Sequence, residues 1–317
     1  MGLLHSFTTD VLEGKYTYNG ISVYRWWLMN GLSAAFYAPG AAFEIYSDGS
    51  PLDGFDSMKL LLDDGSHILP PAMIDRLVKY VKNGGKLAMI CGEAGRKIPG
   101  SDEEHLLLKK LGYTAFDKLH QVHTGPDQLV FRLGNPVLRR TSGIPLHSWY
   151  ELEAPKGGSV IGEVGAKPAA VVWNCGKGEV FLIGGRPGAI TEAEVMKLFD
   201  EKKDKNAWIL WNNAVRNCTD LCRNLLRDLS EWAGEPEQMR IDDDLHAVLR
   251  KQKNGDNYLV YIYNPAPPKR TSLRVTLPEG KRWKATALTL SGEKKLGIVS
   301  SEELAAPGIA LPLLEKD

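Results

Sequence analysis

The sequence predicts an α/β domain followed by a smaller all-β domain. Before residue 234, apolar runs of strand length alternate with amphipathic helical patterns, which is typical of a parallel sheet covered by helices. After residue 234, short strand patterns follow one another with turn residues between them and no helix. A chain of 317 residues also favours two domains, at about 150 residues each. We therefore expect domains at 1–234 and 235–317, the second a β-sandwich.

The clearest pattern is a strand, helix and strand between residues 58 and 92. MKLLLDD (58–64) is an apolar run of strand length, and PPAMIDRLVKYVKNGG (70–85) repeats its apolar residues at helical spacing. Two prolines open this helix and two glycines end it. KLAMICG (86–92) is the second strand. The unit predicts two parallel strands joined by a right-handed crossover.

Further elements are expected on both sides of this unit. A helix at 101–112 is predicted by the capping-box spacing of Ser101 and Glu104. Asn174, Gly176 and Gly178 predict a hairpin turn between two strands. The other expected elements are helices at 21–32 and 206–233, a strand and turn within 41–49, and strands at 128–133, 149–153, 159–165, 168–176 and 178–185.

Composition and charge exclude several classes of protein. Hydrophobic residues make up 43% and charged residues 25%, as in ordinary globular proteins. Lys plus Arg and Asp plus Glu are both 39, so the basic excess of a nucleic-acid binder is missing. No apolar run reaches the roughly 18–20 residues of a membrane span, and no signal peptide is evident. The four cysteines form no metal-site or disulfide pattern, so we expect a cytoplasmic protein without a metal or cofactor.

Acidic and aromatic residues supply the candidate binding groups. Asp63 and Asp64 follow one predicted strand and Glu93 follows the next, so these acids are expected at the edge where open α/β sheets bind ligands. Trp26 and Trp27 are residue types that stack on sugars, although helix packing is the favoured interpretation for both. The favoured interpretation is nevertheless that Asp64 lies in a turn and that Glu93 is a solvated loop residue.

Three segments carry a resemblance to a known family. YVKNGGKLAMICGEAG (80–95), PAAVVWNCGKGEVFLIGG (168–185) and NYLVYIYNP (257–265) resemble, in the same order, the glutamine-amidotransferase-like domain and the small β-sandwich of glycoside hydrolase family 42 β-galactosidases. The resemblance implies a flavodoxin-like or class I amidotransferase-like parallel sheet, and a domain that mediates trimerisation in that family. Its catalytic glutamates lie on a preceding (β/α)8 barrel, which this sequence is expected to lack. No catalytic residue of the family can be carried over.

Cys91 ends a strand at the place where amidotransferase-like folds put their nucleophile. Such a thiol needs a histidine to accept its proton. The stretch FLIGGRPG (181–188), where those folds carry His-x-Glu, contains neither partner. His120 and His123 are three residues apart and lack a third metal ligand in the sequence nearby. A buried structural Cys91 is therefore the favoured interpretation.

These observations favour a non-catalytic accessory and oligomerisation module of a carbohydrate-active enzyme. The expected partners are further copies of the chain or a carbohydrate-active enzyme, with an oligosaccharide as a ligand to be tested and neither nucleic acid nor membrane. One alternative is a thiol-dependent amidohydrolase that uses Cys91. Another is a stand-alone carbohydrate-binding protein.

Overall fold

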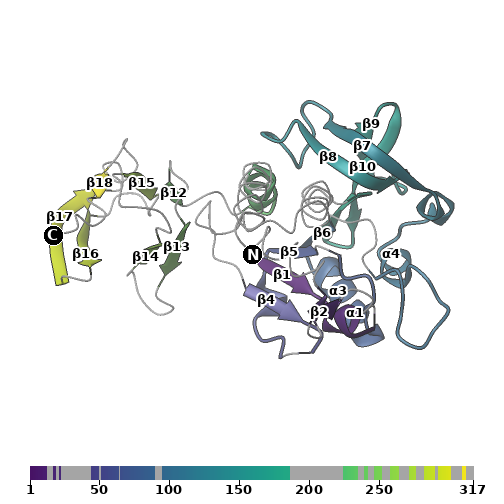
Figure 1. Ribbon diagram of the computed structural model, residues 1–317, viewed down its shortest axis with the longest axis horizontal. Coiled ribbons are helices and arrows are strands. Elements are labelled where there is room, and N and C mark those ends of the chain that lie inside the picture. The colour runs from purple at the N-terminus through teal and green to yellow at the C-terminus, as the bar shows by residue number, and fades with distance from the viewer. Residues whose placement is uncertain are drawn as a thin grey trace. The chain divides into compact units, whose positions relative to one another are not determined.

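The chain divides into two compact units, which are described separately. The first comprises Met1–Ser33 with Phe43–Glu235, and the second comprises Ala34–Ala42 with Pro236–Asp317. The computed structural model (Figure 1) describes residues 1–12, 17–18, 21–22, 44–49, 51–63, 65–89, 95–185, 224–234, 239–241, 246–251, 258–263, 271–275, 282–289, 292–300 and 309–311.

A nine-stranded sheet forms the centre of the first unit. Its first five strands in sheet order are mutually parallel, and the remaining four pair antiparallel. In sheet order the strands are β4 (Glu44–Ser47), β1 (Gly2–His5), β5 (Leu60–Asp63), β6 (Lys86–Met89), β11 (Gly178–Ile183), β10 (Lys167–Cys175), β9 (Ser159–Val164), β7 (Val122–Phe131) and β8 (Gly143–Tyr150).

The parallel half follows a known strand order. Numbered along the chain, its five strands lie in the order 2-1-3-4-5, which is that of flavodoxin-like sheets. The predicted strand, helix and strand unit is confirmed as β5, α3 (Pro71–Lys82) and β6. Strand β1 was not predicted, although it lies between β4 and β5. The α/β class predicted from the sequence is therefore confirmed.

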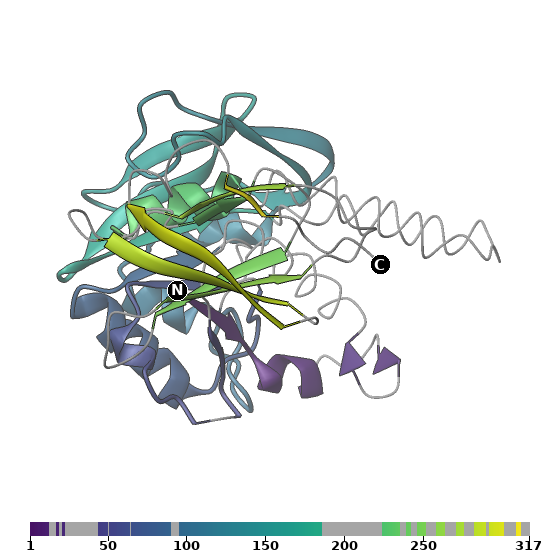
Figure 2. The ribbon, with the colours of Figure 1, turned by 90° about the vertical axis from the view of Figure 1, so that its left-hand side faces the viewer.

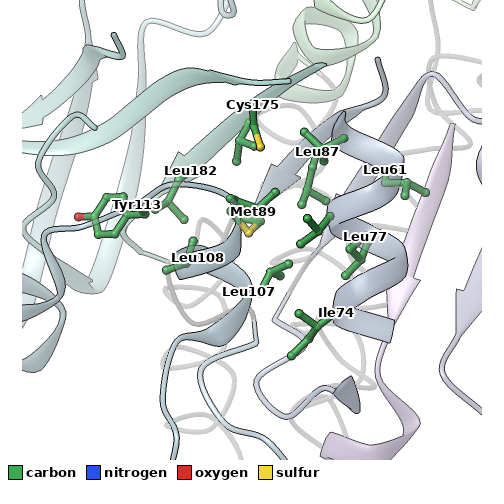
Figure 3. Close-up of a cluster of buried hydrophobic side chains, with 14 of the residues drawn as sticks. Leu61, Ile74, Leu77, Leu87, Met89, Leu107, Leu108, Tyr113, Cys175 and Leu182 are labelled. Atoms are coloured by element: carbon green, nitrogen blue, oxygen red, sulfur yellow. The ribbon is translucent and has the colours of Figure 1, made fainter. Parts of the chain in front are cut away.

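Helices cover this sheet on both faces. On one face, α3 and α4 (Leu106–Lys110) enclose a cluster that includes Ile74, Leu77 and Leu107 (Figure 3). Leu182 of β11 joins that cluster, so its neighbour Phe181 points to the opposite face. There the Phe181 ring lies 6.2 Å from Trp232, in the helical residues 224–232. The described part of the predicted helix 206–233 thus packs on the face away from α3.

The glycines that follow α3, at 84–85, contact the glycine turn at 176–178, which is far away in the sequence. The turn between β10 and β11 lies against the end of α3, and the amide of Lys177 donates a hydrogen bond to the carbonyl of Lys82 (3.0 Å). A Cβ atom at Gly178 would lie 2.2 Å from the carbonyl oxygens of both Val81 and Gly85. The predicted hairpin turn is confirmed, and its glycine is needed because the backbones approach so closely.

The helix expected at 101–112 is shorter than predicted. α4 begins only at Leu106, and its N-cap residue His105 makes no side-chain capping bond. The Ser101 hydroxyl accepts a hydrogen bond from the amide of Glu103 (3.1 Å) and so stabilises a turn before the helix. The carbonyl of Arg96 accepts the His105 amide (2.7 Å), which holds the preceding residues in a loop. The capping-box prediction was wrong for this reason.

The hairpin of β7 and β8 is longer than the strands predicted at 128–133 and 149–153. The remaining short elements of the first unit are α1 (Phe7–Leu12), the 3-10 turns η1 (Phe55–Ser57) and η2 (Phe116–His120), and the hairpin of β2 (Thr17–Tyr18) and β3 (Ile21–Ser22). Of the helix predicted at 21–32, only Ile21 and Ser22 are described, and the prediction was wrong for them because they form β3, paired with β2. No helix in the described ranges is long and apolar enough to cross a membrane.

In the second unit, the described residues form strands in three separate sheets. β12 (Met239–Ile241), β15 (Thr271–Val275) and β18 (Ile309–Leu311) form one antiparallel sheet. β13 (His246–Lys251) pairs with β14 (Tyr258–Tyr263). β16 (Arg282–Thr289) and β17 (Gly292–Ser300) run side by side as a twisted ribbon (Figure 2). Packing of these sheets as a sandwich stays a prediction.

Candidate functional site

The residues that follow the five parallel strands form the carboxyl edge of the sheet. In sheets with this strand order, ligands bind at this edge, where the order reverses between β1 and β5. The candidates Asp64, Glu93 and Cys91, which follow β5 and β6, lie outside the described residues, as do Trp26 and Trp27. The side chains that can be placed at this edge are therefore those of the described residues nearby.

Asp48, which follows β4, occupies the N-terminus of the short helix α1. One carboxylate oxygen of Asp48 accepts the amide of Phe7 (2.6 Å), and the other accepts the amide of Thr8 (3.2 Å). Free amides at this point would suit an anion such as a phosphate. The chain's own carboxylate satisfies them instead, so the described geometry gives no support for nucleotide binding here.

Two buried hydroxyl groups connect β1 to the loop after β5. The Ser6 hydroxyl lies 2.6 Å from the carbonyl of Ile68 and 3.0 Å from the Asp48 carboxylate. The Thr9 hydroxyl donates to the same carbonyl (2.9 Å) and accepts the amide of Ile68 (2.8 Å). These polar groups therefore hold the loops together at the reversal of strand order.

The Asp63 side chain stabilises the backbone that follows β5. Its side chain belongs to a residue that is 1% exposed, and its carboxylate accepts the amides of Gly65 (3.3 Å) and Ser66 (3.1 Å). A carboxylate buried in this way holds the backbone and is not placed as a solvent-facing acid or base. The turn expected at Asp64 falls on a residue outside the described ranges, so it stays a prediction.

On the other side of the edge, Arg96 pairs with Tyr150, the last residue of β8. Arg96 Nη1 donates to the Tyr150 hydroxyl (3.3 Å), and Arg96 Nε lies 3.8 Å from the Glu104 carboxylate. The amide of Tyr150 donates to the carbonyl of Gly184, directly after β11 (2.8 Å). This pair could not be predicted from the sequence, because the two residues are 54 positions apart and belong to no motif.

The histidines singled out in the sequence do not converge on one site. The His123 ring stacks on Trp149, with centroids 4.3 Å apart, whereas His120 meets the edge of His105 at 6.1 Å. In the described ranges, no three or more His, Cys, Asp or Glu side chains gather in a group that could hold a metal ion. Trp149 is a buried core residue, and its indole N–H donates to Asp127 (2.7 Å).

Comparisons with known proteins relate the chain to glycosidases. Models of known protein families give no match. The β-galactosidase YesZ of Bacillus licheniformis is 27% identical over 165 residues, which are 49% of this chain and 23% of YesZ. The chain is thus similar to a β-galactosidase over part of its length.

Solved structures share the fold at low sequence identity. A β-galactosidase of Bacillus circulans sp. alkalophilus matches 94% of this chain and 40% of its own, at a TM-score of 0.58 and 13% identity. A catalytic mutant of Gan42B, a GH42 β-galactosidase of G. stearothermophilus, matches 94% of this chain and 38% of its own, at a TM-score of 0.60 and 14% identity. An α-L-fucosidase of Paenibacillus thiaminolyticus matches 94% of this chain and 46% of its own, at a TM-score of 0.53 and 13% identity. The chain therefore spans less than half the length of each of these enzymes.

Proposed function

We propose that this chain is a non-catalytic accessory and assembly module of the β-galactosidase type. Residues 1–234 would be its amidotransferase-like domain and 235–317 its β-sandwich. The observation that carries the proposal is the unequal coverage, because the shared fold takes in 94% of this chain but 40% or less of the two β-galactosidases. In the family that the sequence resembles, catalysis belongs to a barrel outside this region.

The described carboxyl edge supports a non-catalytic role. Glycoside hydrolysis uses two carboxyl groups about 5–9.5 Å apart on either side of the scissile bond. Asp48 and Asp63, the described acids at this edge, are both hydrogen-bonded to backbone amides. Both carboxylates therefore stabilise loops, and neither is directed at a substrate.

Exposed apolar side chains on α1 support an assembly role. Phe7 and Val11 are one helical turn apart and are 56% and 59% exposed, and Leu12 is 56% exposed. Ile45, on the neighbouring strand β4, is 49% exposed. Exposed apolar side chains side by side on one helix face, as Phe7 and Val11 are, are typical of protein interfaces. The partner would be a second copy of the chain or a carbohydrate-active enzyme.

Carbohydrate contact is the second part of the proposal. Asp64, Glu93, Trp26 and Trp27 are its candidate groups. A ligand that binds only the folded chain stabilises it by about 2.7 kcal/mol at a hundredfold excess over Kd. A panel of galactosides and other oligosaccharides, tested by thermal denaturation, should therefore show a saturable rise in Tm for one sugar. Loss of that rise in Trp27→Ala, but not in the buried-core control Trp173→Phe, would support the assignment.

Hydrolysis of p-nitrophenyl β-D-galactoside tests the non-catalytic role. The purified chain is expected to release no more nitrophenol than an identically purified blank. Turnover that persists through purification and is lost in Glu93→Gln would overturn the non-catalytic role. Turnover of an amide substrate that is lost in Cys91→Ser would favour the thiol-enzyme alternative.

A further inference from the structure

His105 combines two unusual features at one residue. Its backbone has φ 60° and ψ 29°, and among the described residues it is the one non-glycine with a positive φ. The residue is 3% exposed, yet neither ring nitrogen has a hydrogen-bond partner. A left-handed backbone and an unpaired buried imidazole both oppose folding, so the surrounding contacts must hold His105 in place.

Those contacts come from the segment 95–105 and from the elements beside it. The His105 amide donates to the Arg96 carbonyl (2.7 Å), and the ring stacks on Phe116 with centroids 5.6 Å apart. At the other end of the segment, the amide of Gly95 donates to the Ser66 carbonyl (2.7 Å). The segment therefore runs from the loop after β5 to the start of α4, beside the carboxyl edge, and His105 holds its far end.

The charges around the ring are mainly positive. Arg96 and Glu104 belong to the segment itself, Lys109 to α4 and His120 to η2. Together these influences lower the pKa of His105 from 6.5 to about 4: burial contributes most, Arg96, His120 and Lys109 act in the same direction, and Glu104 opposes them. The ring is therefore neutral in the closed segment at pH 7, and an imidazole released into water would regain its ordinary pKa.

We propose that His105 is an acid-sensitive latch that releases the segment 95–105 as the pH falls. The open state binds a proton that the closed state resists, so the closed state is most stable above pH 6.5 and loses stability between pH 6.5 and 4. With pKa values of 6.5 open and about 4 closed, the open population rises about 25-fold from pH 7.5 to pH 5. Opening would remove the Arg96 contact with Tyr150.

Amide hydrogen exchange of the full chain tests the latch. After correction for intrinsic exchange rates, peptides covering 95–107 should show opening about 25-fold more frequent at pH 5 than at pH 7.5. Peptides covering α3 should change little. The proposal would be overturned if amide exchange of the 95–107 peptides in the unmodified chain did not depend on pH, or if exchange in α3 changed by the same factor.

Variants at two histidines make the test specific. His105→Asn keeps a residue type that tolerates a positive φ but does not titrate, so the pH response of 95–107 should disappear. His120→Asn removes the exposed neighbouring histidine and should leave most of the response. His105→Gly provides a second non-titrating variant should the asparagine variant fold poorly. A full response in both His105 variants would overturn the assignment.

Discussion

The carboxylate of Asp228 is fully buried and holds Arg140, a residue 88 positions away in the sequence. It accepts the Arg140 guanidinium (2.9 Å) and the Arg140 amide (2.9 Å), together with the amide and hydroxyl of Thr141 (2.9 Å each). Glu231 pairs with the same guanidinium, and hydrogen bonding to Glu231 and Asp228 raises the pKa of Arg140. These bonds fasten the helical residues 224–232 to the loop before β8.

Asp228→Ala should destabilise the first unit by about 3–5 kcal/mol, because it leaves the amide of Arg140 and the amide and hydroxyl of Thr141 without their acceptor. Urea denaturation followed by circular dichroism measures this loss. Glu231→Gln is the matched control and should cost about 1 kcal/mol or less, since the Glu231 ion pair is partly solvated. Equal, small effects of the two variants would show that Asp228 is not a structural anchor.

Gly178→Ala should cost about 3 kcal/mol, because the new methyl group meets backbone oxygens at 2.2 Å on two sides. Gly157→Ala is the control: Gly157 has a positive φ of 78°, but nothing lies within 4 Å of its Cβ position. Only the backbone preference, about 1 kcal/mol, should be lost there. Thermal denaturation compares the two, and an equal loss of Tm would contradict the interlocked glycine turns.

Asp48→Ala should lower the free energy of unfolding by about 1–2 kcal/mol, because two amides at the start of α1 lose their acceptor. Asp56→Ala removes an exposed acid 3.4 Å from Arg76 and should change stability by no more than about 1 kcal/mol. Chemical denaturation of both variants is the measurement. An Asp48 variant as stable as the unmodified chain would mean that its carboxylate is available for another role.

Cys175 should react slowly with iodoacetamide at neutral pH, because burial protects its thiol and raises its pKa. Mass spectrometry of tryptic peptides measures the labelling rate of each cysteine in the folded chain and in urea. Cys91 should also label no faster than an ordinary thiol if the non-catalytic account holds. Labelling of Cys91 much faster in the folded chain than in urea would instead indicate an activated nucleophile.

The spacing of apolar residues predicted those elements whose formation depends on residues close together in the sequence. The apolar spacing of Met73, Leu77 and Val81 located α3, because this helix has one clearly buried face. β1 was missed because GLLH is only four residues long and its burial depends on partners on both sides. Glu104 suggested a helix start, but the hydrogen bond between the backbones of Arg96 and His105 delays that start.

The site was less predictable because its contacts are long-range. Nothing in the spacing of Asp48 and Ser6, or of Arg96 and Tyr150, shows that their side chains meet. The glycine motifs at 84–85 and 176–178 were each visible as turns, but only the structure shows that they touch. The sequence therefore located the edge of the sheet without showing which polar groups are used within it.

Sedimentation velocity of the purified chain over a wide concentration range tests the assembly role most directly. The account predicts a species heavier than the monomer, whose fraction rises with concentration. Phe7→Glu with Val11→Glu should shift it toward monomer, whereas Leu133→Glu, at a fully exposed turn, should not. Monomer alone at every concentration, with no heavier species when a barrel-bearing β-galactosidase is added, would contradict the account.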